Sequence, residues 1–422
     1  MRVLVVGGGG REHALAWKLA QSPQVDKLVA APGNAGIAKV AECVSIQAKD
    51  LNSLVDYAQR EKIDLVVVGP EDPLCDGLVD RLKALGIRAF GPTRAAAQLE
   101  GSKVFSKEFM RRHHIPTAHF EVFDRYDEAR GYVQDLEDSF PLVVKADGLA
   151  LGKGVVVCQE PADAEEALHR IMVDKALGRA GDRVVIEECL VGQEVSLMVI
   201  ADGKDFIALI PAQDHKAAYD GDQGPNTGGM GCYSPVPLFT PERVAEAIEK
   251  VVKPTIAGMA AEGNPFAGVL YAGLMVTHDD IWVLEYNCRF GDPETQLVLP
   301  LMQADLAELL GKAADGALAG VEVGWAGGAA VCVVMASGGY PGTYHKGIPI
   351  DGLEDAAATG AVVFHAGTAA SDSQIVTAGG RVLGVTATGA DHASAMEHAY
   401  AAVKMIDFDG AHYRRDIGRR AL

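Results

Sequence analysis

Residues 284–294 read Leu284-Glu285-Tyr286-Asn287-Cys288-Arg289-Phe290-Gly291-Asp292-Pro293-Glu294. The apolar residues 281–284 at its start are typical of a strand, and a charged residue interrupts the run where it should be most buried. Because residues i and i+2 of a strand share a face, Glu285 and Asn287 are expected to point the same way. Two hard oxygen donors on one face, with Arg289 beyond them, suit a Mg²⁺ ion carrying a polyphosphate. A structural Glu–Arg pair at a strand end is the alternative.

Length and composition limit the class of protein. A chain of 422 residues is too long for one compact core, so three or four domains are expected. An apolar content of 49% excludes global disorder, and a formal charge of −19 argues against binding nucleic acid or an anionic membrane through the overall field. The seven cysteines form no C-x-x-C pair, and the apolar run 3–6 is too short for a signal peptide. We therefore expect a cytoplasmic protein without a membrane span.

The N-terminal part alternates short β-branched runs with helical patterns. We expect a helix at residues 12–21 and strands at residues 3–6, 28–31, 63–68 and 88–90. This alternation predicts a doubly wound parallel sheet whose ligands lie at the carboxyl ends of the strands.

A run of four glycines, residues 7–10, separates the first strand from the first helix. Unpaired N–H groups at a helix start and the small size of glycine favour a bound phosphate there, although a tight turn without a ligand is the alternative. The G-x-G-x-x-G pattern fails because Glu12 or His13 occupies the third glycine position. A phosphorylated sugar therefore fits better than NAD.

The middle and end of the chain divide into three further parts. One helix over residues 95–114 leads to a small α+β module, residues 120–189, and then to a larger unit with hairpin signals at Asp202-Gly203 and Asp279-Asp280. Within the small module we expect a helix at residues 162–173 and strands at residues 142–145, 155–157 and 184–188. Within the last section, residues 326–422, we expect a helix at residues 393–405 and strands at residues 330–335, 362–364 and 382–386. Its sparse charged residues indicate an accessory α+β domain.

Two glycine-rich segments are candidates for ligand binding. Residues 145–154 form a strand–loop–strand with two lysines, which departs from a Walker A loop and suits a flap over a polyphosphate, with a solvated hairpin as the alternative. Residues 213–235 contain no strand or helix pattern and favour a binding loop over a disordered segment. Residues 184–190 connect the two units and could offer backbone groups to an adenine edge, although a plain core strand is equally compatible.

Taken together, these stretches resemble glycinamide ribonucleotide synthetase, an ATP-grasp family of purine biosynthesis. The resemblance runs in family order from the first residue to Arg415-Asp416-Ile417-Gly418. Its motifs are Gly9-Gly10-Arg11-Glu12-His13-Ala14-Leu15-Ala16-Trp17, Ala31-Pro32-Gly33-Asn34-Ala35-Gly36, Leu99-Glu100-Gly101-Ser102-Lys103, Val144-Lys145-Ala146-Asp147-Gly148-Leu149-Ala150, Gly224-Pro225-Asn226-Thr227-Gly228-Gly229-Met230-Gly231 and Asn287-Cys288-Arg289-Phe290-Gly291-Asp292-Pro293-Glu294-Thr295-Gln296.

The resemblance implies a multidomain α/β and α+β fold and a two-step reaction. The implied domains are a phosphosugar-binding α/β domain at 1–100, an ATP-grasp central domain at 101–119 and 190–325, a small mobile lid at 120–189 and a C-terminal domain at 326–422. Glycine's carboxylate attacks the γ-phosphate of ATP, and the amine of 5-phosphoribosylamine then displaces phosphate from the acyl phosphate. The products are glycinamide ribonucleotide, ADP and phosphate.

The resemblance also assigns residues to roles. Glu285 and Asn287 bind Mg²⁺ or Mn²⁺. The implied ATP-binding residues are Lys103, Lys145, Lys153, Glu187, Glu188, Cys189, Leu190 and Glu194. The implied substrate-binding residues are Gly10, Asn34, Asp214, Lys216, Gly291 and Asp292, and the implied catalytic residues are Arg289, Lys153 and Asp214.

Three positions depart from the family pattern, namely Gly8, Gln193 and Ala217. None of them alters the metal pair or the lysines. Another ATP-grasp ligase that activates a different carboxylate is the runner-up, and a non-catalytic nucleotide-sensing module is a further alternative. The partners expected are small molecules alone, in a monomer or a homodimer.

Overall fold

The N-terminal part is a five-stranded parallel sheet in the computed structural model, which describes residues 1–136, 139–149, 154–372 and 374–422. The strand order is β3-β2-β1-β4-β5, so the order reverses beside β1. The strands are β1 (Arg2–Gly7), β2 (Lys27–Pro32), β3 (Glu42–Cys43), β4 (Leu65–Val68) and β5 (Arg88–Phe90). The predicted doubly wound sheet is confirmed, and its glycine loop lies at the carboxyl end of β1, where ligands bind such sheets.

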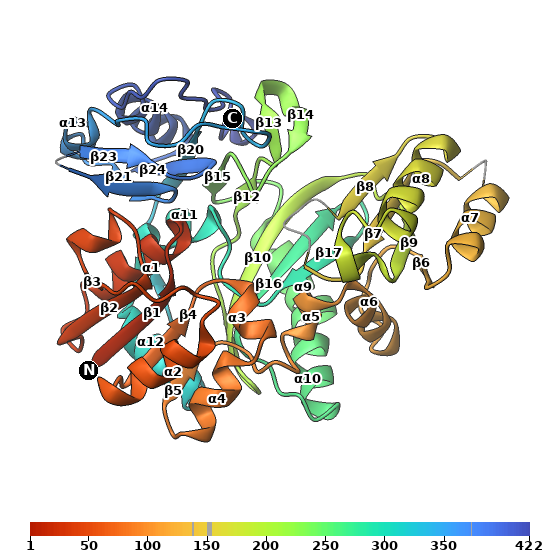
Figure 1. The fold of residues 1–422 in the computed structure, drawn as a ribbon, viewed down its shortest axis with the longest axis horizontal. Coiled ribbons are helices and arrows are strands. Elements are labelled where there is room, and N and C mark those ends of the chain that lie inside the picture. Colours follow the sequence, from red (N-terminus) through yellow and green to blue (C-terminus); the bar gives the residue numbers. More distant parts are fainter. Residues whose placement is uncertain (137–138, 150–153, 373) are drawn as a thin grey trace.

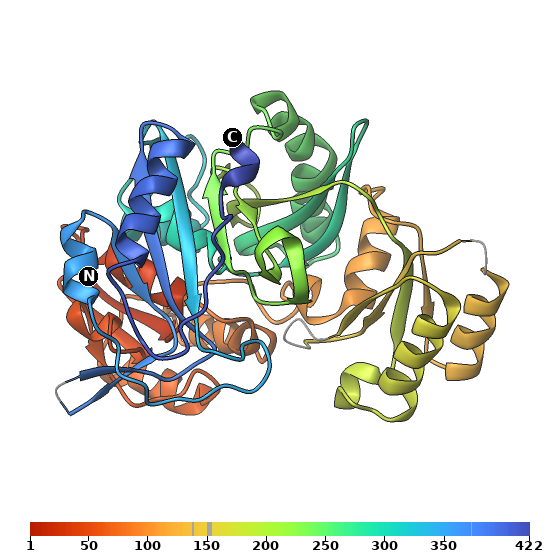
Figure 2. The ribbon, with the colours of Figure 1, turned by 90° about the horizontal axis from the view of Figure 1, so that it is seen from above.

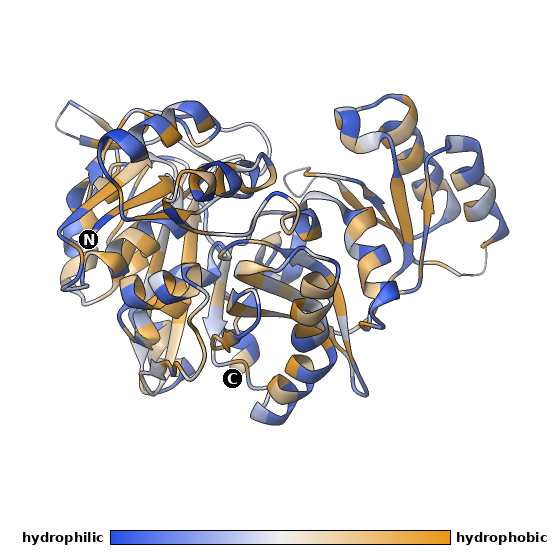
Figure 3. Ribbon diagram, turned by 90° about the horizontal axis from the view of Figure 1, so that it is seen from below, coloured by the Kyte–Doolittle hydropathy of each residue, from blue (hydrophilic) through white to orange (hydrophobic). Residues whose placement is uncertain are grey.

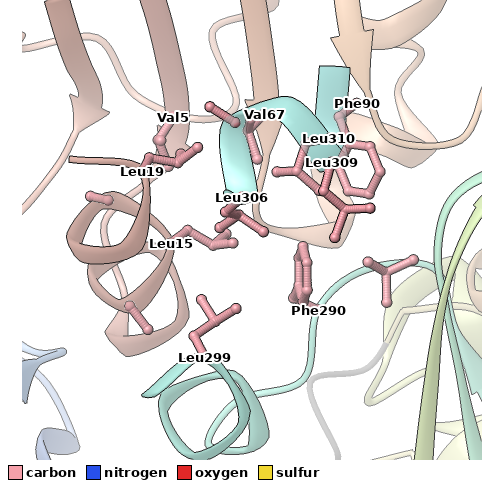
Figure 4. Packing of buried hydrophobic residues seen from close by; sticks show 14 of the residues in the cluster. Val5, Leu15, Leu19, Val67, Phe90, Phe290, Leu299, Leu306, Leu309 and Leu310 are labelled. Carbon is pink, nitrogen blue, oxygen red and sulfur yellow. The ribbon is translucent and has the colours of Figure 1, made fainter. Parts of the chain in front are cut away.

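Alternate residues of these strands enter two separate cores, one on each face of the sheet. In β1, Leu4 and Val6 pack on one face and Val3 and Val5 on the other. The first face is covered by α2 (Leu51–Arg60), α3 (Glu71–Cys75) and α4 (Leu78–Ala84). The second face is covered by α1 (Gly10–Leu19) and by α12 (Leu306–Ala314), which comes from far along the chain (Figure 4). The N-terminal sheet therefore completes its core with residues of the central unit.

The predicted helix at residues 95–114 is wrong as a single element. The structure has two helices, α5 (Gln98–Gly101) and α6 (Lys103–Arg112), with a break at Ser102. Ser102 has extended backbone angles, and its hydroxyl accepts a hydrogen bond from the Phe105 N–H at 3.0 Å. The break follows from the preference of serine for the N-cap position, which satisfies a donor at the start of α6.

The small module predicted at residues 120–189 projects from the rest of the molecule (Figures 1 and 2). Its antiparallel sheet has the order β6-β9-β7-β8 and its own apolar core. The elements are β6 (Phe120–Phe123), α7 (Tyr126–Asp135), β7 (Leu142–Ala146), β8 (Val155–Cys158), α8 (Pro161–Leu168) and β9 (Val184–Glu188). The predicted strands are confirmed, and the helix predicted at residues 162–173 consists of α8 and a π-helix, His169–Val173, that follows it. Residues 150–153, and Lys153 with them, lie outside the described residues.

The central unit is built on four antiparallel strands in the order β11-β10-β16-β17. They are β10 (Gln193–Asp202), β11 (Phe206–Ala208), β16 (Ala267–Val276) and β17 (Ile281–Asn287). Both predicted hairpins are confirmed, because β10 pairs with β11 and β16 with β17. Its helices are α9 (Pro241–Ala247), α10 (Lys253–Ala261), α11 (Glu294–Leu301) and α12, and the short strands β18 (Met302–Gln303) and β19 (Gly324–Trp325) pair with each other.

The expectation that residues 213–235 contain no strand is also wrong. They hold β12 (Gln213–Asp214), β13 (Ala217–Tyr219), β14 (Gln223–Asn226) and β15 (Gly231–Ser234). β12 and β15 continue the sheet of the last section, in the order β12-β15-β20-β24-β21. Strands of two to four residues with many glycines carry too little alternation to be recognised, and their partners lie far away in sequence.

The last section contains the predicted strands and helix. They are β20 (Ala329–Ala336), β21 (Val362–His365), β24 (Arg381–Gly389) and α14 (His392–Val403), with α13 (Leu353–Ala358), β22 (Thr368–Ser371) and β23 (Gln374–Thr377) in addition. The strands of the molecule are largely apolar, whereas the outer helices mix polar and apolar residues (Figure 3). Among the described residues, no helix is both long and apolar enough to cross a membrane. The exact domain boundaries stay a prediction.

Candidate active site

A β-bulge at Leu284 decides where the carboxylate of β17 points. Gly273 lies opposite Glu285 but Leu274 lies opposite Val283, so Leu284 is an extra residue in the ladder. Val283 and Tyr286 both pack in the core, which regular alternation would not allow. The bulge therefore turns Glu285 and Asn287 together to the opposite face, as bulges beside active sites commonly do.

Glu285 faces several cations. Burial alone would raise the pKa of its carboxyl group, but Lys216, Lys145 and the other nearby cations hold this pKa below its ordinary value. Lys103 is another of these cations. The lysines also contact other groups: Lys216 is paired with Glu194 at 2.7 Å, and Lys103 donates to the Gly148 carbonyl at 3.0 Å. The Glu285 carboxylate is thus ionised and surrounded by positive charge.

Arg289 is held by carboxylates from two other segments. Its Nε lies 3.3 Å from Glu71 at the start of α3, and its Nη2 lies 3.2 Å from Glu100 in α5. Nη2 also donates to Asn287 Oδ1 at 2.9 Å. Glu100 in turn accepts from the Cys288 N–H at 2.7 Å. The guanidinium therefore fixes the amide of Asn287, and Glu71 and Glu100 are site residues that the sequence reading missed.

Glu285 and Asn287 fit a hard divalent cation. One ionised carboxylate and one oriented amide oxygen project from the same face of β17, and Mg²⁺ commonly binds one or two protein oxygens with substrate phosphates supplying more. Among the described residues no cluster of three His, Cys, Asp or Glu side chains could hold a metal by itself. The protein ligands thus suit a metal that arrives with a polyphosphate.

Lys145 is positioned by an ion pair at the base of the small module. Glu187 is buried between Lys145 and Lys107 and pairs with both. Lys145 Nζ also donates to the Leu284 carbonyl at 3.1 Å, so the bulged residue links β17 to β7. Burial lowers the pKa of Lys107 to about 8, and Lys107 also donates to Thr117 at 2.6 Å. Sequence reading missed Lys107, whose helical position carried no sign of burial.

The predicted adenine connector spans the end of β9. The backbone of Glu187 is paired with strands on both sides, and Glu188 accepts from the His119 N–H at 2.8 Å. Cys189 and Leu190 follow the strand, beyond its last ladder partner. The backbone groups of Cys189 and Leu190 lie outside the strand pairing and are therefore available to hydrogen-bond an adenine base.

Asp214 lies beside the buried carboxylate of Glu294. Burial and the charge of Glu294 raise the pKa of Asp214 well above its ordinary value. Glu294 accepts from Ser196 Oγ at 3.0 Å and from the Tyr271 hydroxyl at 2.9 Å. A Cβ on Gly291 would lie 2.5 Å from a Glu294 oxygen, so the glycine leaves that carboxylate room.

Asp292 joins the N-terminal loop to the C-terminal domain. It accepts from the Arg11 N–H at 3.3 Å and lies 3.3 Å from Arg381 Nη2. Arg381, at the start of β24, also donates to the Gly228 carbonyl at 2.6 Å. Arg381 is a further residue that sequence reading missed, because its charge is isolated within an otherwise apolar section.

The start of α1 differs from the predicted phosphate site. The Gly9 N–H donates to Glu12 Oε2 at 2.6 Å, and the Arg11 N–H donates to Asp292. Two donors at this helix start are therefore taken by protein carboxylates. Glu12 at the third helical position is a capping-box signal that could have been recognised in the sequence. Gly10 allows α1 to meet α11 closely, since a Cβ there would lie 2.4 Å from Gln296 Nε2.

Both the nitrogen and the oxygen of the Asn34 side-chain amide form hydrogen bonds with other groups of the protein. Its Nδ2 donates to the carbonyls of Gly8 at 2.9 Å and His365 at 2.8 Å, and its Oδ1 accepts from the N–H groups of Gly36 and Ile37. The structure gives it a positioning role between the glycine loop and β21. At Gly8, the position that departs from the family pattern, a Cβ would lie 2.4 Å from the Gly33 carbonyl oxygen.

The structure thus brings the predicted residues into two groups. The first surrounds Glu285 and contains Asn287, Arg289, Lys103, Lys145, Lys216 and Glu194. The second lies around Asp292, which follows Gly291 and accepts from Gln296 at 2.8 Å. Gly10 adjoins Gln296, and Asn34 donates to Gly8 in the same glycine loop. Asp214 adjoins Gly229, whose carbonyl accepts from Arg381.

Comparison with known proteins agrees with this architecture. Models of the phosphoribosylglycinamide synthetase N domain, ATP-grasp (A) domain and C domain match residues 1–100, 101–295 and 330–420. Biotin carboxylase from Campylobacter jejuni has a similar fold, with a TM-score of 0.74 at 15% identity over 99% of this chain and 94% of that one. The fold and the site therefore define an ATP-grasp protein.

Relatives of higher identity specify the family. Phosphoribosylamine–glycine ligases from Allochromatium vinosum and Escherichia coli strain K12 are 52% and 50% identical, each over 100% of this chain and 99% of the relative. The crystal structure of phosphoribosylamine–glycine ligase from Thermotoga maritima has a TM-score of 0.85 at 35% identity, covering 99% of this chain and 100% of that one. The chain belongs to the phosphoribosylglycinamide synthetase family.

Two buried histidines at the interface of α1 and β21 predict acid sensitivity. His13 Nδ1 accepts from the His365 N–H at 2.7 Å, and burial lowers the pKa of His13 to about 3 and that of His365 to about 4. Below about pH 6.5 the unfolded chain binds more protons than the folded one, so stability falls as pH falls. Each histidine should remove up to about 1.4 kcal/mol from the free energy of unfolding per pH unit.

Urea unfolding of His13→Gln at pH 7, 6 and 5 measures this contribution. Glutamine can still accept the His365 N–H but does not titrate, so the variant should lose stability less steeply than the parent as the pH falls. The control is His278→Gln, at a side chain that is 97% exposed in the β16–β17 turn. If the free energy of unfolding of His13→Gln fell with pH as steeply as that of the parent protein, His13 would not be a source of the acid sensitivity.

Proposed function

We propose that this chain joins glycine to 5-phosphoribosylamine at the expense of ATP, giving glycinamide ribonucleotide, ADP and phosphate in purine biosynthesis. The observation that carries the proposal is the full-length similarity to phosphoribosylamine–glycine ligases, together with the cationic site around Glu285. Phosphoryl transfer needs positioning and charge neutralisation more than a protein nucleophile, and this site supplies both.

Glu285 and Asn287 are the proposed ligands of Mg²⁺ or Mn²⁺. When bound, the metal neutralises phosphate charge and aligns the polyphosphate. Lys145 and Lys103 are proposed to contact the ATP phosphates, with Lys153 from outside the described residues. Arg289, which is held by Glu71 and Glu100, is proposed to stabilise charge on the transferring phosphoryl group. Its fixed geometry avoids reorganisation during the reaction.

The nucleoside end of ATP is assigned to the connector after β9. Glu187 holds Lys145 with its side chain, so its contribution to ATP is indirect. Glu188, Cys189 and Leu190 are proposed to present backbone groups to adenine. Glu194 is proposed to accept from a ribose hydroxyl while it remains paired with Lys216.

Glycine and phosphoribosylamine are assigned to the region between Asp214 and Asp292. Lys216 is proposed to bind the glycine carboxylate, because it lies between Glu194 and the metal-binding face of β17. Asp214 and Gly291 are proposed to line the site of the amine. Gly10 and Asp292 are proposed to face the phosphosugar, with Asn34 holding their loop in place.

The location and assembly are also proposals. All seven cysteines are free thiols, which supports a cytoplasmic location. A monomer or a homodimer that binds small molecules is proposed.

Release of ADP by the purified protein tests the function. The assay contains Mg²⁺-ATP and glycine, with and without phosphoribosylamine generated in situ. ADP release that requires both substrates, with a product of the mass of glycinamide ribonucleotide, is expected. Release with another carboxylate would instead support a different ATP-grasp ligase, and ATP binding without any turnover would support a sensor.

Substitution of Glu285 tests the metal site. Glu285→Gln keeps the shape of the side chain but removes its charge, so kcat should fall by on the order of 100-fold or more while the fold is retained. The apparent affinity for Mg²⁺ should fall as well. Steady-state rates over a Mg²⁺ titration, with the exposed Glu322→Gln as control, measure both effects. Near-normal turnover by a folded Glu285→Gln would refute the metal role.

The projecting module, residues 120–189, is proposed to act as a lid. An acyl phosphate is hydrolysed by water, so closure of the module over the site is chemically expected. Limited proteolysis should therefore cut this module more slowly when Mg²⁺-ATP is present. Equal rates with and without nucleotide would count against a lid.

A further inference from the structure

The hairpin β13–β14 lacks support from any sheet. Its two strands pair only with each other in the described structure, and all four residues of β14 are exposed. An isolated two-stranded hairpin is marginally stable in water. Some other part of the protein must therefore hold it in one position.

The C-terminal tail, residues 412–420, provides that support (Figure 1). Arg414 is 1% exposed, and its Nη1 donates to the Ala217 carbonyl at 3.1 Å and to Asp222 at 3.0 Å. The other edge of its guanidinium forms a two-point pair with Asp416 at 2.8 and 2.7 Å. Asp416 also accepts from the Gly221 N–H at 2.9 Å, so the pair reaches the turn of the hairpin.

Further contacts join the same two segments. The Arg415 N–H donates to Asp220 at 2.7 Å, and His412 Nε2 lies 2.8 Å from the Ala218 carbonyl oxygen. The ring of His412 also packs edge-on against Tyr219, with the centroids 5.3 Å apart. The strand β13 and the turn of the hairpin are thus held by the tail, and β14 is held through its pairing with β13.

The hairpin leads directly into the site. Ala217, whose carbonyl Arg414 holds, follows Lys216, and the Lys216 carbonyl accepts from the Thr227 N–H at 2.7 Å at the other end of the hairpin. Lys216 Nζ lies 2.7 Å from Glu194, and Glu194 and Glu285 together keep the pKa of Lys216 above its ordinary value in spite of burial. A shift of the hairpin would therefore move Lys216 relative to Glu285.

We propose that the C-terminal tail is a positioning element for the loop that carries Lys216, residues 213–235, and that Arg414 is its central positioning residue. Arg414 touches no substrate in this proposal. It fixes the hairpin, and the hairpin fixes Lys216 where it binds the glycine carboxylate. The inference rests on the proposed function for the identity of that substrate.

Arg414→Lys tests the proposal. Lysine keeps the charge but cannot bond Asp416, Asp222 and the Ala217 carbonyl together, because it lacks the planar fork of donors. The KM for glycine should rise about tenfold, while the KM for ATP changes less than about twofold. The matched control is Arg415→Lys, at the adjacent exposed arginine whose backbone N–H, rather than its side chain, meets the hairpin.

A second variant covers the case in which Arg414→Lys does not fold. Asp222 has a half-exposed side chain and a positive φ of 59°, a conformation that asparagine also tolerates. Asp222→Asn therefore keeps the turn and removes the charge that faces Arg414. It should raise the KM for glycine severalfold.

Chymotrypsin cleavage after Tyr219 provides a readout independent of activity. Tyr219 is 49% exposed, so loosening of the hairpin should make the cut several times faster in Arg414→Lys and Asp222→Asn, and not in Arg415→Lys. Folded variants with parental cleavage rates and parental KM for glycine would overturn the proposal, as would a lowered Tm with no change in either. If the parent protein shows no glycine-dependent ADP release, the proposed function fails, and the cleavage rates alone still decide whether the tail holds the hairpin.

Discussion

The cations of the site depend on carboxylates that come from other segments of the chain, of which Glu187 and Glu100 are buried. A buried charge without a partner is strongly destabilising, and this chain, with a net charge of −19, has to bind several anions in one place. The structure meets both requirements by tying each cation to an acidic partner. The pairs are Lys145 with Glu187, Lys216 with Glu194, Arg289 with Glu71 and Glu100, and Arg381 with Asp292. The positive groups are consequently in place before a substrate arrives, which suits a reaction that relies on electrostatic stabilisation.

Because of these pairs, the site is built from residues of all the domains. Glu71 lies in α3 of the N-terminal part, Arg381 lies in β24 of the C-terminal sheet, and both contact residues that follow β17. The N-terminal sheet uses α12 to complete its core, and the C-terminal sheet includes β12 and β15 from residues 213–235. The last section of the chain is therefore more than an accessory domain, because it anchors the loop that carries Asp214 and Lys216.

Much of the fold was accessible from local patterns. The strands β1, β4 and β20 are largely apolar and bounded by turn residues, so their positions could be predicted. The shared face of Glu285 and Asn287 was also predicted, but the regular alternation of a strand explains it only in part. Regular alternation would have placed Val283 on that face too, and only the extra residue Leu284 separates the core side chains from Glu285 and Asn287. A bulge depends on pairing with β16, which no local pattern reveals.

The sequence by itself determined the family, the order of the domains, the glycine turns and the identity of most charged groups around the site, because these follow from local periodicity and from motifs that are contiguous in the chain. Only the tertiary structure decided which charges are paired. Arg289 meets Glu71 across 218 residues and Arg381 meets Asp292 across 89, and Asn34 uses its amide to bind Gly8 and His365. Such partners are selected by how the domains pack. An unpaired buried charge is costly because it loses its contact with water. The partner that offsets this cost has to be near in space and need not be near in the sequence.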